Sequence, residues 1–171
     1  MMALIEAIFA RTHISELDLA LRLLVAVALG GVIGWEREAK SRPAGLKTHM
    51  LTSLAAAVFA VVALELVHWA QKNGTSADPI RAIEAVTAGV AFLAAGTIIQ
   101  SRGKVTGLTT GASMWLAGAI GVAAGTGLYS IAIFVAFLAF LILAGLQRLS
   151  QNINPEDGTR PPLEKVDHMD P

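Results

Sequence analysis

Five long apolar runs alternate with short polar connections along the chain. A helix needs about 17 to 25 residues to cross the hydrocarbon core of a bilayer, and each run reaches or nearly reaches that length. The runs are apolar on all sides of a helix, which lipid accepts and water does not. The pattern therefore predicts an all-α membrane protein with five transmembrane helices. The runs cover residues 17–35, 50–67, 83–99, 109–124 and 128–146.

Composition supports the same class. Of 171 residues, 54% are hydrophobic and 15% are charged, and the mean hydropathy is +0.61. A soluble helical bundle is the alternative, but the short connections supply too little polar surface for one. The chain has no cysteine, which excludes disulfides and thiolate metal sites. It also carries no zinc-hydrolase, nucleophile-elbow or phosphate-loop motif, so we expect no enzyme activity, and we expect no nucleic-acid partner.

The five-helix domain, residues 17–146, is flanked by two segments of different character. Residues 1–16 are predicted to be an interfacial segment, because four apolar residues, Leu4, Ile5, Ile8 and Phe9, would share one helical face. A frayed terminus is the alternative. Residues 147–171 are polar and contain Pro-rich stretches, which predicts a disordered cytoplasmic tail.

The basic residues predict the orientation of the chain. Five crossings place the termini on opposite sides, and nine Lys and Arg residues fall on the C-terminal side against four on the N-terminal side. By the positive-inside rule the N-terminus lies outside and the C-terminus is cytoplasmic. The nine are Arg37, Lys40, Arg42, Lys47, Arg102, Lys104, Arg148, Arg160 and Lys165, and the four are Arg11, Arg22, Lys72 and Arg81.

One pattern occurs twice: a basic residue, two further residues, and then Gly-Leu-x-Thr. The copies are residues 42–48 and 104–110, and residues 20–58 can be laid without gaps on residues 82–120. Both units start on the same side, which predicts a parallel internal repeat of helices one and two with helices three and four. Helix five is then extra. We expect Gly45 and Gly107 to adopt positive φ, and Thr48 and Thr110 to cap the helices that they open.

The overlay places Arg22 opposite Glu84, near the outer ends of helices one and three. Charges within spans are costly, so we expect either an ion pair between them or separate contacts of each with its interface. Asp78 precedes Pro79 and fits a helix N-cap. A second interpretation groups Glu65, Asp78 and Glu84 as oxygen donors for Mg²⁺. We otherwise expect no cofactor.

Charged residues also gather at the cytoplasmic end of helix one, around the first Gly-Leu-x-Thr copy. Glu36 and Arg37 close the helix, and Arg42 and His49 follow. Binding to anionic lipid is the simplest role for this cluster. We expect His49 to be a hydrogen-bonded structural residue.

Glycines recur at helix-packing spacing. Small residues four apart let helix backbones approach closely, which predicts a compact bundle with little interior space. The glycines expected to pack are Gly30, Gly34, Gly89, Gly96, Gly121 and Gly125, together with Gly107, Gly111 and Gly118.

Several of these motifs together resemble the MgtC/SapB family of bacterial inner-membrane proteins. They are residues 21–24, Gly30-Gly31-x-x-Gly34-x-Glu36-Arg37, the Arg42 to His49 turn, Asp78-Pro79-x-Arg81, and the segment from Gly107 to Trp115 that includes Thr109 and Thr110. The resemblance covers about residues 17 to 146. It marks these residues as family signatures, and Glu84 lies beside Ala85, where a Gln is common in the family.

The resemblance implies a five-helix domain in the bacterial inner membrane, linked to growth in low Mg²⁺ and, in some members, to survival inside macrophages. It implies the F-type ATP synthase as a partner, although members were named as Mg²⁺ transporters. Longer relatives add a cytoplasmic ACT-like domain, which the polar tail here cannot form. Ala91, Ala94 and Ala124 stand where Gly or Cys occurs in relatives.

Three functions remain open. The first is a regulator that contacts a membrane partner under Mg²⁺ limitation or related stress. The second is a transporter of Mg²⁺ or another ion that uses the region of Arg22, Asp78 and Glu84. The third is a scaffold that self-associates through its glycine faces.

Overall fold

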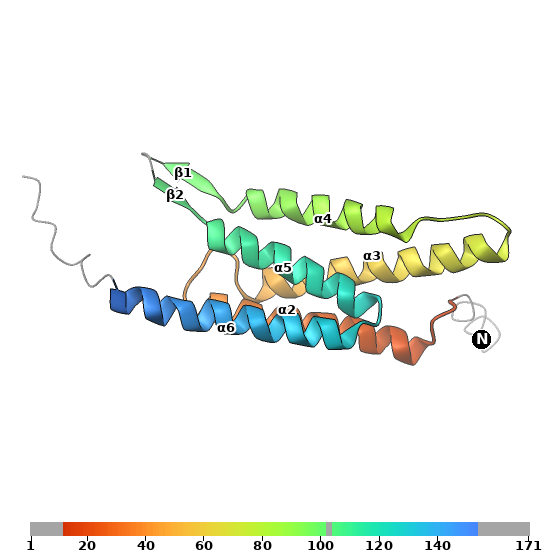
Figure 1. Ribbon diagram of the computed structural model, residues 1–171, viewed down its shortest axis with the longest axis horizontal. Coiled ribbons are helices and arrows are strands. Elements are labelled where there is room, and N and C mark those ends of the chain that lie inside the picture. The colour runs from red at the N-terminus through yellow and green to blue at the C-terminus, as the bar shows by residue number, and fades with distance from the viewer. Residues whose placement is uncertain (1–11, 102–103, 154–171) are drawn as a thin grey trace, which may run out of the picture.

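The computed structural model describes residues 12–101 and 104–153, and within them the chain forms five helices and one short β-hairpin (Figure 1). Successive helices run in opposite directions, so the connections alternate between the two ends of the bundle (Figure 1). The predicted all-α class is confirmed. The helices are α2 (Glu16–Ala39), α3 (Leu46–Lys72), α4 (Pro79–Ala95), α5 (Leu108–Gly125) and α6 (Tyr129–Ile153), and the strands are β1 (Ile99–Ser101) and β2 (Lys104–Thr106).

The outer surface of the bundle is apolar, as expected of a protein that lipid surrounds. Large hydrophobic side chains such as Leu17, Phe92 and Phe134 are exposed by 82%, 80% and 62%. The helices α2, α3 and α5 are long and apolar enough to cross a membrane, whereas α4 has 17 residues and the apolar part of α6 ends at Gly145. The chain is an integral membrane protein.

Helix α3 lies between two glycine pairs. A Cβ at Gly30 would approach the Cβ of Ser53 to 2.7 Å, and one at Gly34 would approach the Cα of Leu46 to 2.7 Å. From the other side, Gly121 of α5 meets the Ser53 carbonyl, and a Cβ at Gly125 would approach the Ala57 carbonyl oxygen to 2.5 Å. The packing roles predicted for these four glycines are confirmed, because no larger residue fits such backbone contacts.

Two other glycines do not pack. A Cβ at Gly89 would meet nothing within 4 Å, and Gly96 is the C-cap of α4, near only the carbonyls of its own last turn. Their predicted packing roles were wrong. The reason is that α4 stands at the edge of the bundle, against α3 and α5 (Figure 1), so one of its faces has no helix to meet.

The third apolar run does not stay helical to residue 99. Helix α4 ends at Ala95, where the Thr97 hydroxyl donates to the Ala94 carbonyl (2.7 Å), and Ile99 begins the β-hairpin, paired with Thr106. Periodicity cannot distinguish a short apolar strand from the end of a buried helix. The connection between α4 and α5 is therefore a hairpin, whereas the connection between α2 and α3 is an irregular turn. The two units of the proposed repeat thus differ at the Gly-Leu-x-Thr segments that suggested the repeat.

The glycine turns also differ. Gly107 has φ of +88° as predicted, but Gly45 has φ of −110°, so positive φ was wrong there. The left-handed residue of the first turn is Ser41, with φ of +52°. The Ser41 and Arg42 amides donate to the carbonyls of Glu38 (2.9 Å) and Arg37 (3.1 Å), which is a Schellman C-cap on α2.

The helix caps follow local chemistry. Asp78 accepts from the Ile80 amide (2.9 Å) with Pro79 in the first turn, which confirms its predicted cap. Thr48 and Thr110 do not cap their helices, since the N-cap positions are occupied by Gly45 and Gly107. Helix α4 thus ends before the end of the third apolar run. Helix α6, in contrast, continues to Ile153, into the segment predicted as a tail. The predictions for residues 1–11 and 154–171 lie outside the described residues.

Gly121→Ala should destabilise the bundle by about 1 to 3 kcal/mol, because a methyl group would force α5 away from α3. Gly89→Ala is the matched control. It should be neutral or stabilise by up to about 1 kcal/mol, since its Cβ meets open space in a helix. Unfolding of the purified variants in mixed detergent micelles measures both. Equal destabilisation by the two substitutions would contradict the packing described.

Candidate functional site

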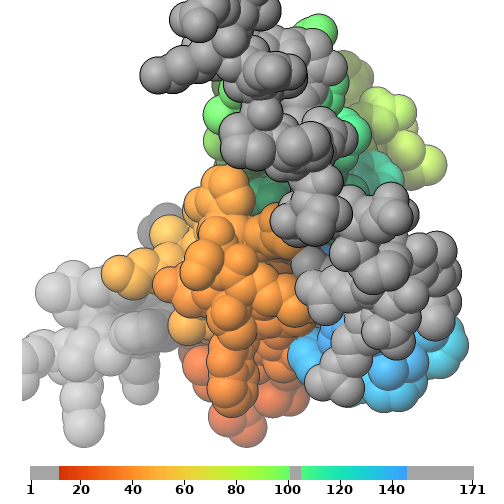
Figure 2. Space-filling model, turned by 90° about the vertical axis from the view of Figure 1, so that its left-hand side faces the viewer, coloured from red at the N-terminus to blue at the C-terminus, as the bar shows by residue number. Residues whose placement is uncertain are grey.

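The two Gly-Leu-x-Thr segments meet at one end of the bundle, where α2 ends and α3 and α5 begin. In the end view of Figure 2 the connection between α2 and α3 (orange) faces the viewer, with α6 (blue) to its lower right. Most of the predicted signature residues gather here. We call a set of polar residues at this end the polar cluster: the buried Glu36, Arg37, His49, Thr110 and Ser113, and the partly buried Lys40.

His49 joins α3 to α5 at the centre of the polar cluster. Its side chain is fully buried, with Nδ1 2.8 Å from the Gly45 carbonyl oxygen and Nε2 3.0 Å from the Ser113 hydroxyl. Because a carbonyl can only accept, Nδ1 carries a proton. The expected structural role of His49 is confirmed, and the contact makes Ser113 part of the site.

Glu36 and Arg37 are buried at the end of α2, exposed by 7% and 3%. The Glu36 carboxylate forms an ion pair with Lys40 and lies 3.7 Å from the nearest nitrogen of the Arg37 guanidinium. Arg37 donates from Nη2 to the Thr110 hydroxyl of α5 (3.3 Å), and Lys40 donates to the Leu143 carbonyl of α6 (3.0 Å). One carboxylate therefore serves two cations, which tie α2 to two other helices.

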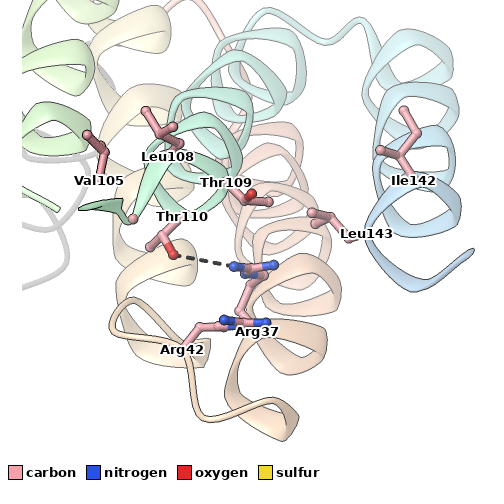
Figure 3. Close-up of a pocket in the computed structure, with 9 residues that line it drawn as sticks. Arg37, Arg42, Val105, Leu108, Thr109, Thr110, Ile142 and Leu143 are labelled. Atoms are coloured by element: carbon pink, nitrogen blue, oxygen red, sulfur yellow. Dashed lines mark hydrogen bonds between the residues drawn. The ribbon is translucent and has the colours of Figure 1, made fainter. Parts of the chain in front are cut away.

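A pocket of about 510 Å³ opens beside the polar cluster, between the ends of α2, α5 and α6 (Figure 3). Arg37 and Arg42 line it side by side, with Thr109 and Thr110 of α5 above them (Figure 3). Apolar side chains form the rest of its wall. The structure thus brings together two basic signature residues that are five positions apart and two threonines from the second repeat unit.

The opposite end of the bundle is closed by Arg22. Its guanidinium binds the Asp18 carboxylate at 2.7 Å and donates to the Gly125 carbonyl of α5 at 2.9 Å, and the Tyr129 hydroxyl of α6 donates to Asp18 at 3.0 Å. Arg22 therefore satisfies a carbonyl at the C-terminal end of α5. The expected ion pair with Glu84 was wrong: Glu84 is exposed on α4, a helix that Arg22 does not bind.

The three carboxylates considered as a magnesium set serve separate purposes. Glu65 accepts the amides of His13 (2.8 Å) and Ile14 (2.9 Å), and Asp78 caps α4. Over residues 12–101 and 104–153, no group of three or more His, Asp or Glu side chains could hold a metal ion. Arg81 and Thr48 are exposed, and the Thr48 hydroxyl donates to the Gly45 carbonyl (3.0 Å).

Four residues of these clusters were not among the candidate site residues, although Ser113 belongs to the segment from Gly107 to Trp115 that carries the family resemblance. Asp18 stands one helical turn before Arg22, and Lys40 one turn after Glu36, so i to i+4 spacing is a signal for both pairs. Ser113 stands one turn after a signature residue, Thr109. Nothing in the sequence pointed to Tyr129, because its partner lies on another helix.

A groove of about 520 Å³ runs between α3 and α4 on the outer surface. Small residues line much of it, among them Ala55 and Ala63 of α3 and Ala82, Ala85 and Gly89 of α4. Ala85 and Gly89 are four residues apart and both exposed. Gly89 thus faces open space on this groove, since no atom of the described chain lies within 4 Å of the position that a Cβ would take.

Comparison with known proteins gives a consistent result. The model of the MgtC family matches residues 23–152. Protein SrpB of Synechococcus elongatus is 36% identical over 146 residues, which cover 79% of this chain and 78% of that protein. Protein MgtC of Brucella abortus is 39% identical over 126 residues, 74% of this chain and 50% of that protein.

A third relative carries a functional name. "Putative magnesium transporter YhiD" of Escherichia coli is 33% identical over 140 residues, 78% of this chain and 62% of that protein. The matched region thus spans only about half to three fifths of two of these relatives. No solved structure matches the chain.

Arg22→Gln should lower stability by about 1.5 to 3 kcal/mol, because it removes charged hydrogen bonds to Asp18 and the Gly125 carbonyl. Arg81→Gln, which changes an exposed arginine at the same end, should stay within about 0.5 kcal/mol. Thermal unfolding in detergent distinguishes them. A loss no larger for Arg22→Gln than for Arg81→Gln would show that the contact contributes nothing.

Ser113→Ala should cost about 1 to 3 kcal/mol, since it leaves the buried Nε2 of His49 without its partner. Ser130→Ala, at an exposed serine on α6, is the control and should have little effect. The same unfolding assay measures the pair, and a neutral Ser113→Ala would mean that Nε2 finds another partner.

Proposed function

The chain belongs to the MgtC family, and we propose that it is a regulator in the bacterial inner membrane that binds a transmembrane helix of a partner protein. Its role would be adaptation to low Mg²⁺ or related stress. The chain covers less than two thirds of the length of two of the three relatives, so this role is proposed for the membrane domain. The orientation proposed is the one that the basic residues predict, with the N-terminus outside and the C-terminus cytoplasmic.

The groove between α3 and α4 carries this proposal. Within a membrane, helices associate by close packing on small residues rather than by a hydrophobic driving force. The groove offers such a surface, with Ala85 and Gly89 on one wall and Ala55 and Ala63 on the other. Larger side chains, including Phe59, Leu66 and Leu93, also line it. Its shape and chemistry suit a helix with small residues of its own at the contact.

Some helix glycines pack against this chain and Gly89 does not, and this difference supports binding of another protein at Gly89. Gly30, Gly34, Gly121 and Gly125 are each filled by backbone of this same chain, whereas Gly89 has nothing within 4 Å of the position that a Cβ would take. Glycine in a helix interior costs about 1 kcal/mol relative to alanine. An unfilled helical glycine on a membrane-facing groove is explained if a partner fills it.

The F-type ATP synthase, which the family resemblance implies, is the partner that we propose to test first. Self-association through the same groove is the scaffold alternative, and it would place a second copy of this chain there. Both partners would insert a helix at Gly89, so the same substitution blocks either, and the captured protein tells them apart.

Magnesium transport is the second candidate, favoured by the name of the Escherichia coli relative. Asp78 and Glu84 are the carboxylates to test, since both are exposed near the N-terminal end of α4. Purified protein in liposomes would show Mg²⁺ flux that falls in an Asp78→Asn, Glu84→Gln double variant. Such flux would eliminate a purely regulatory role, and its absence at every Mg²⁺ gradient would eliminate transport.

Gly89→Leu should abolish co-purification with the F-type ATP synthase and growth in low Mg²⁺, because leucine fills the position where a partner helix would pack. Ala91→Leu is the matched control: Ala91 is exposed on the opposite face of α4, and both readouts should stay at the wild-type level. Thermal unfolding establishes that the two variants are equally folded. Wild-type binding and growth of Gly89→Leu would overturn the proposal.

A further inference from the structure

The pocket between the ends of α2, α5 and α6 is lined by two positively charged arginine side chains. Arg37 lines it with a side chain that is only 4% exposed. Its Nε atom is buried and has no hydrogen-bond partner within the described part of the chain. A buried guanidinium nitrogen without a partner is costly. An acceptor that approached this guanidinium from the pocket would lower that cost.

Arg42 adds a second positive charge next to the first (Figure 3). Over residues 12–101 and 104–153 its side chain makes no hydrogen bond or ion pair. The nearby carboxylates are engaged elsewhere, Glu36 with Lys40 and Arg37, and Glu38 with the Leu46 amide (2.8 Å). Two adjacent guanidinium groups repel each other unless an anion lies between or over them.

Helix α5 begins at the same pocket. Gly107 is its N-cap and offers no side-chain acceptor, so the first-turn amides of α5 keep their capacity to donate. These amides and the helix dipole favour a negatively charged group. The exposed Thr109 adds a hydroxyl donor at the same place. Arg37 of α2 and Arg42 of the turn that follows it therefore line the same pocket as the first-turn amides of α5.

The remaining wall is apolar. Leu108 and Ile142 are exposed by 59% and 56%, and Val105 and Leu143 complete the wall. A small inorganic anion has no use for such a surface, whereas a phospholipid presents its phosphate and acyl chains side by side. The pocket also lies at the ends of α2 and α5, which is the depth of the headgroups in a bilayer that these helices cross.

We propose that this pocket binds the phosphate group of an anionic phospholipid, held by Arg37, Arg42 and the first turn of α5, with an acyl chain along Leu108 and Ile142. This is a defined lipid site within the bundle, beyond general attraction of basic residues to the membrane surface. It does not depend on the partner proposed for the α3/α4 groove.

The test titrates the purified full-length chain in neutral detergent with phosphatidylglycerol and follows the bound lipid by native mass spectrometry. Wild-type protein should retain phosphatidylglycerol over phosphatidylcholine. Arg42→Gln should weaken binding by about tenfold or more, because it removes charge-assisted hydrogen bonds. Lys47→Gln, which removes an exposed charge on α3 outside the pocket, should change the affinity by less than about twofold.

Thr109→Glu is the second variant. An acidic residue in the first turn of a helix is favourable for folding, yet its carboxylate would occupy the anion position and repel a phosphate. It should therefore unfold no earlier than wild type while losing phosphatidylglycerol. Loss of binding with retained stability separates a ligand site from a structural role.

Three outcomes would overturn the proposal. Equal weakening by Arg42→Gln and Lys47→Gln would show diffuse surface charge. Binding of phosphatidylcholine as tight as that of phosphatidylglycerol would show that charge is not recognised. Competition by inorganic phosphate at concentrations similar to those of the lipid would assign the pocket to a free anion, because the acyl chain would then contribute nothing.

Discussion

The backbone contact of α3 with two neighbouring helices is the constraint on which the rest of the bundle depends. Ser53 lies between Gly30 of α2 and Gly121 of α5, and its hydroxyl donates to the Ala26 carbonyl of α2 at 2.8 Å. Lipid gives helices no hydrophobic reason to associate, so van der Waals packing at glycine and such buried hydrogen bonds hold them together. Side chains at these glycines would separate the helices.

The close approach of these helices also assembles the polar cluster. Because α3 contacts α2 at Gly34 and α5 at Gly121, the starts of α3 and α5 lie beside the end of α2. Only at that separation can His49 reach Ser113 and Arg37 reach Thr110. Arg37 and His49 are buried with partners on α5, and the buried Glu36 pairs with Lys40 and Arg37 at the end of its own helix. These contacts offset the cost of removing the buried groups from water. The two arginines left facing the pocket carry charge that these partners do not neutralise.

The glycine positions divide the molecule into a closed part, where other helices of the chain pack on them, and an open part, the groove between α3 and α4. Helix α3 packs on the glycines of α2 and α5, and α4 packs on Gly111 and Gly118 of α5 through Ala94 and Val90, whereas Gly89 of α4 faces the groove. For a member of the MgtC family, this division separates the residues that make the fold from those available to partners. The signature residues predicted from the sequence fall mostly in the closed part, where they assemble the bundle and its polar end.

The sequence by itself determined the elements: five helices, the Asp78 cap, the positive φ of Gly107 and the two filled glycine pairs. These follow from hydrophobic length, local hydrogen bonding and residue size, which neighbours along the chain decide. Only the tertiary structure decided the hairpin at Ile99, the open position of Gly89 and the contact of Arg22 with the Gly125 carbonyl. Each of these depends on which helix face meets which, and an apolar helix in lipid carries no polar side to reveal it. Arg22 reaches the Gly125 carbonyl and not Glu84 because α5, rather than α4, packs against α2 at that end, and Asp18 lies one turn before it on the same helix.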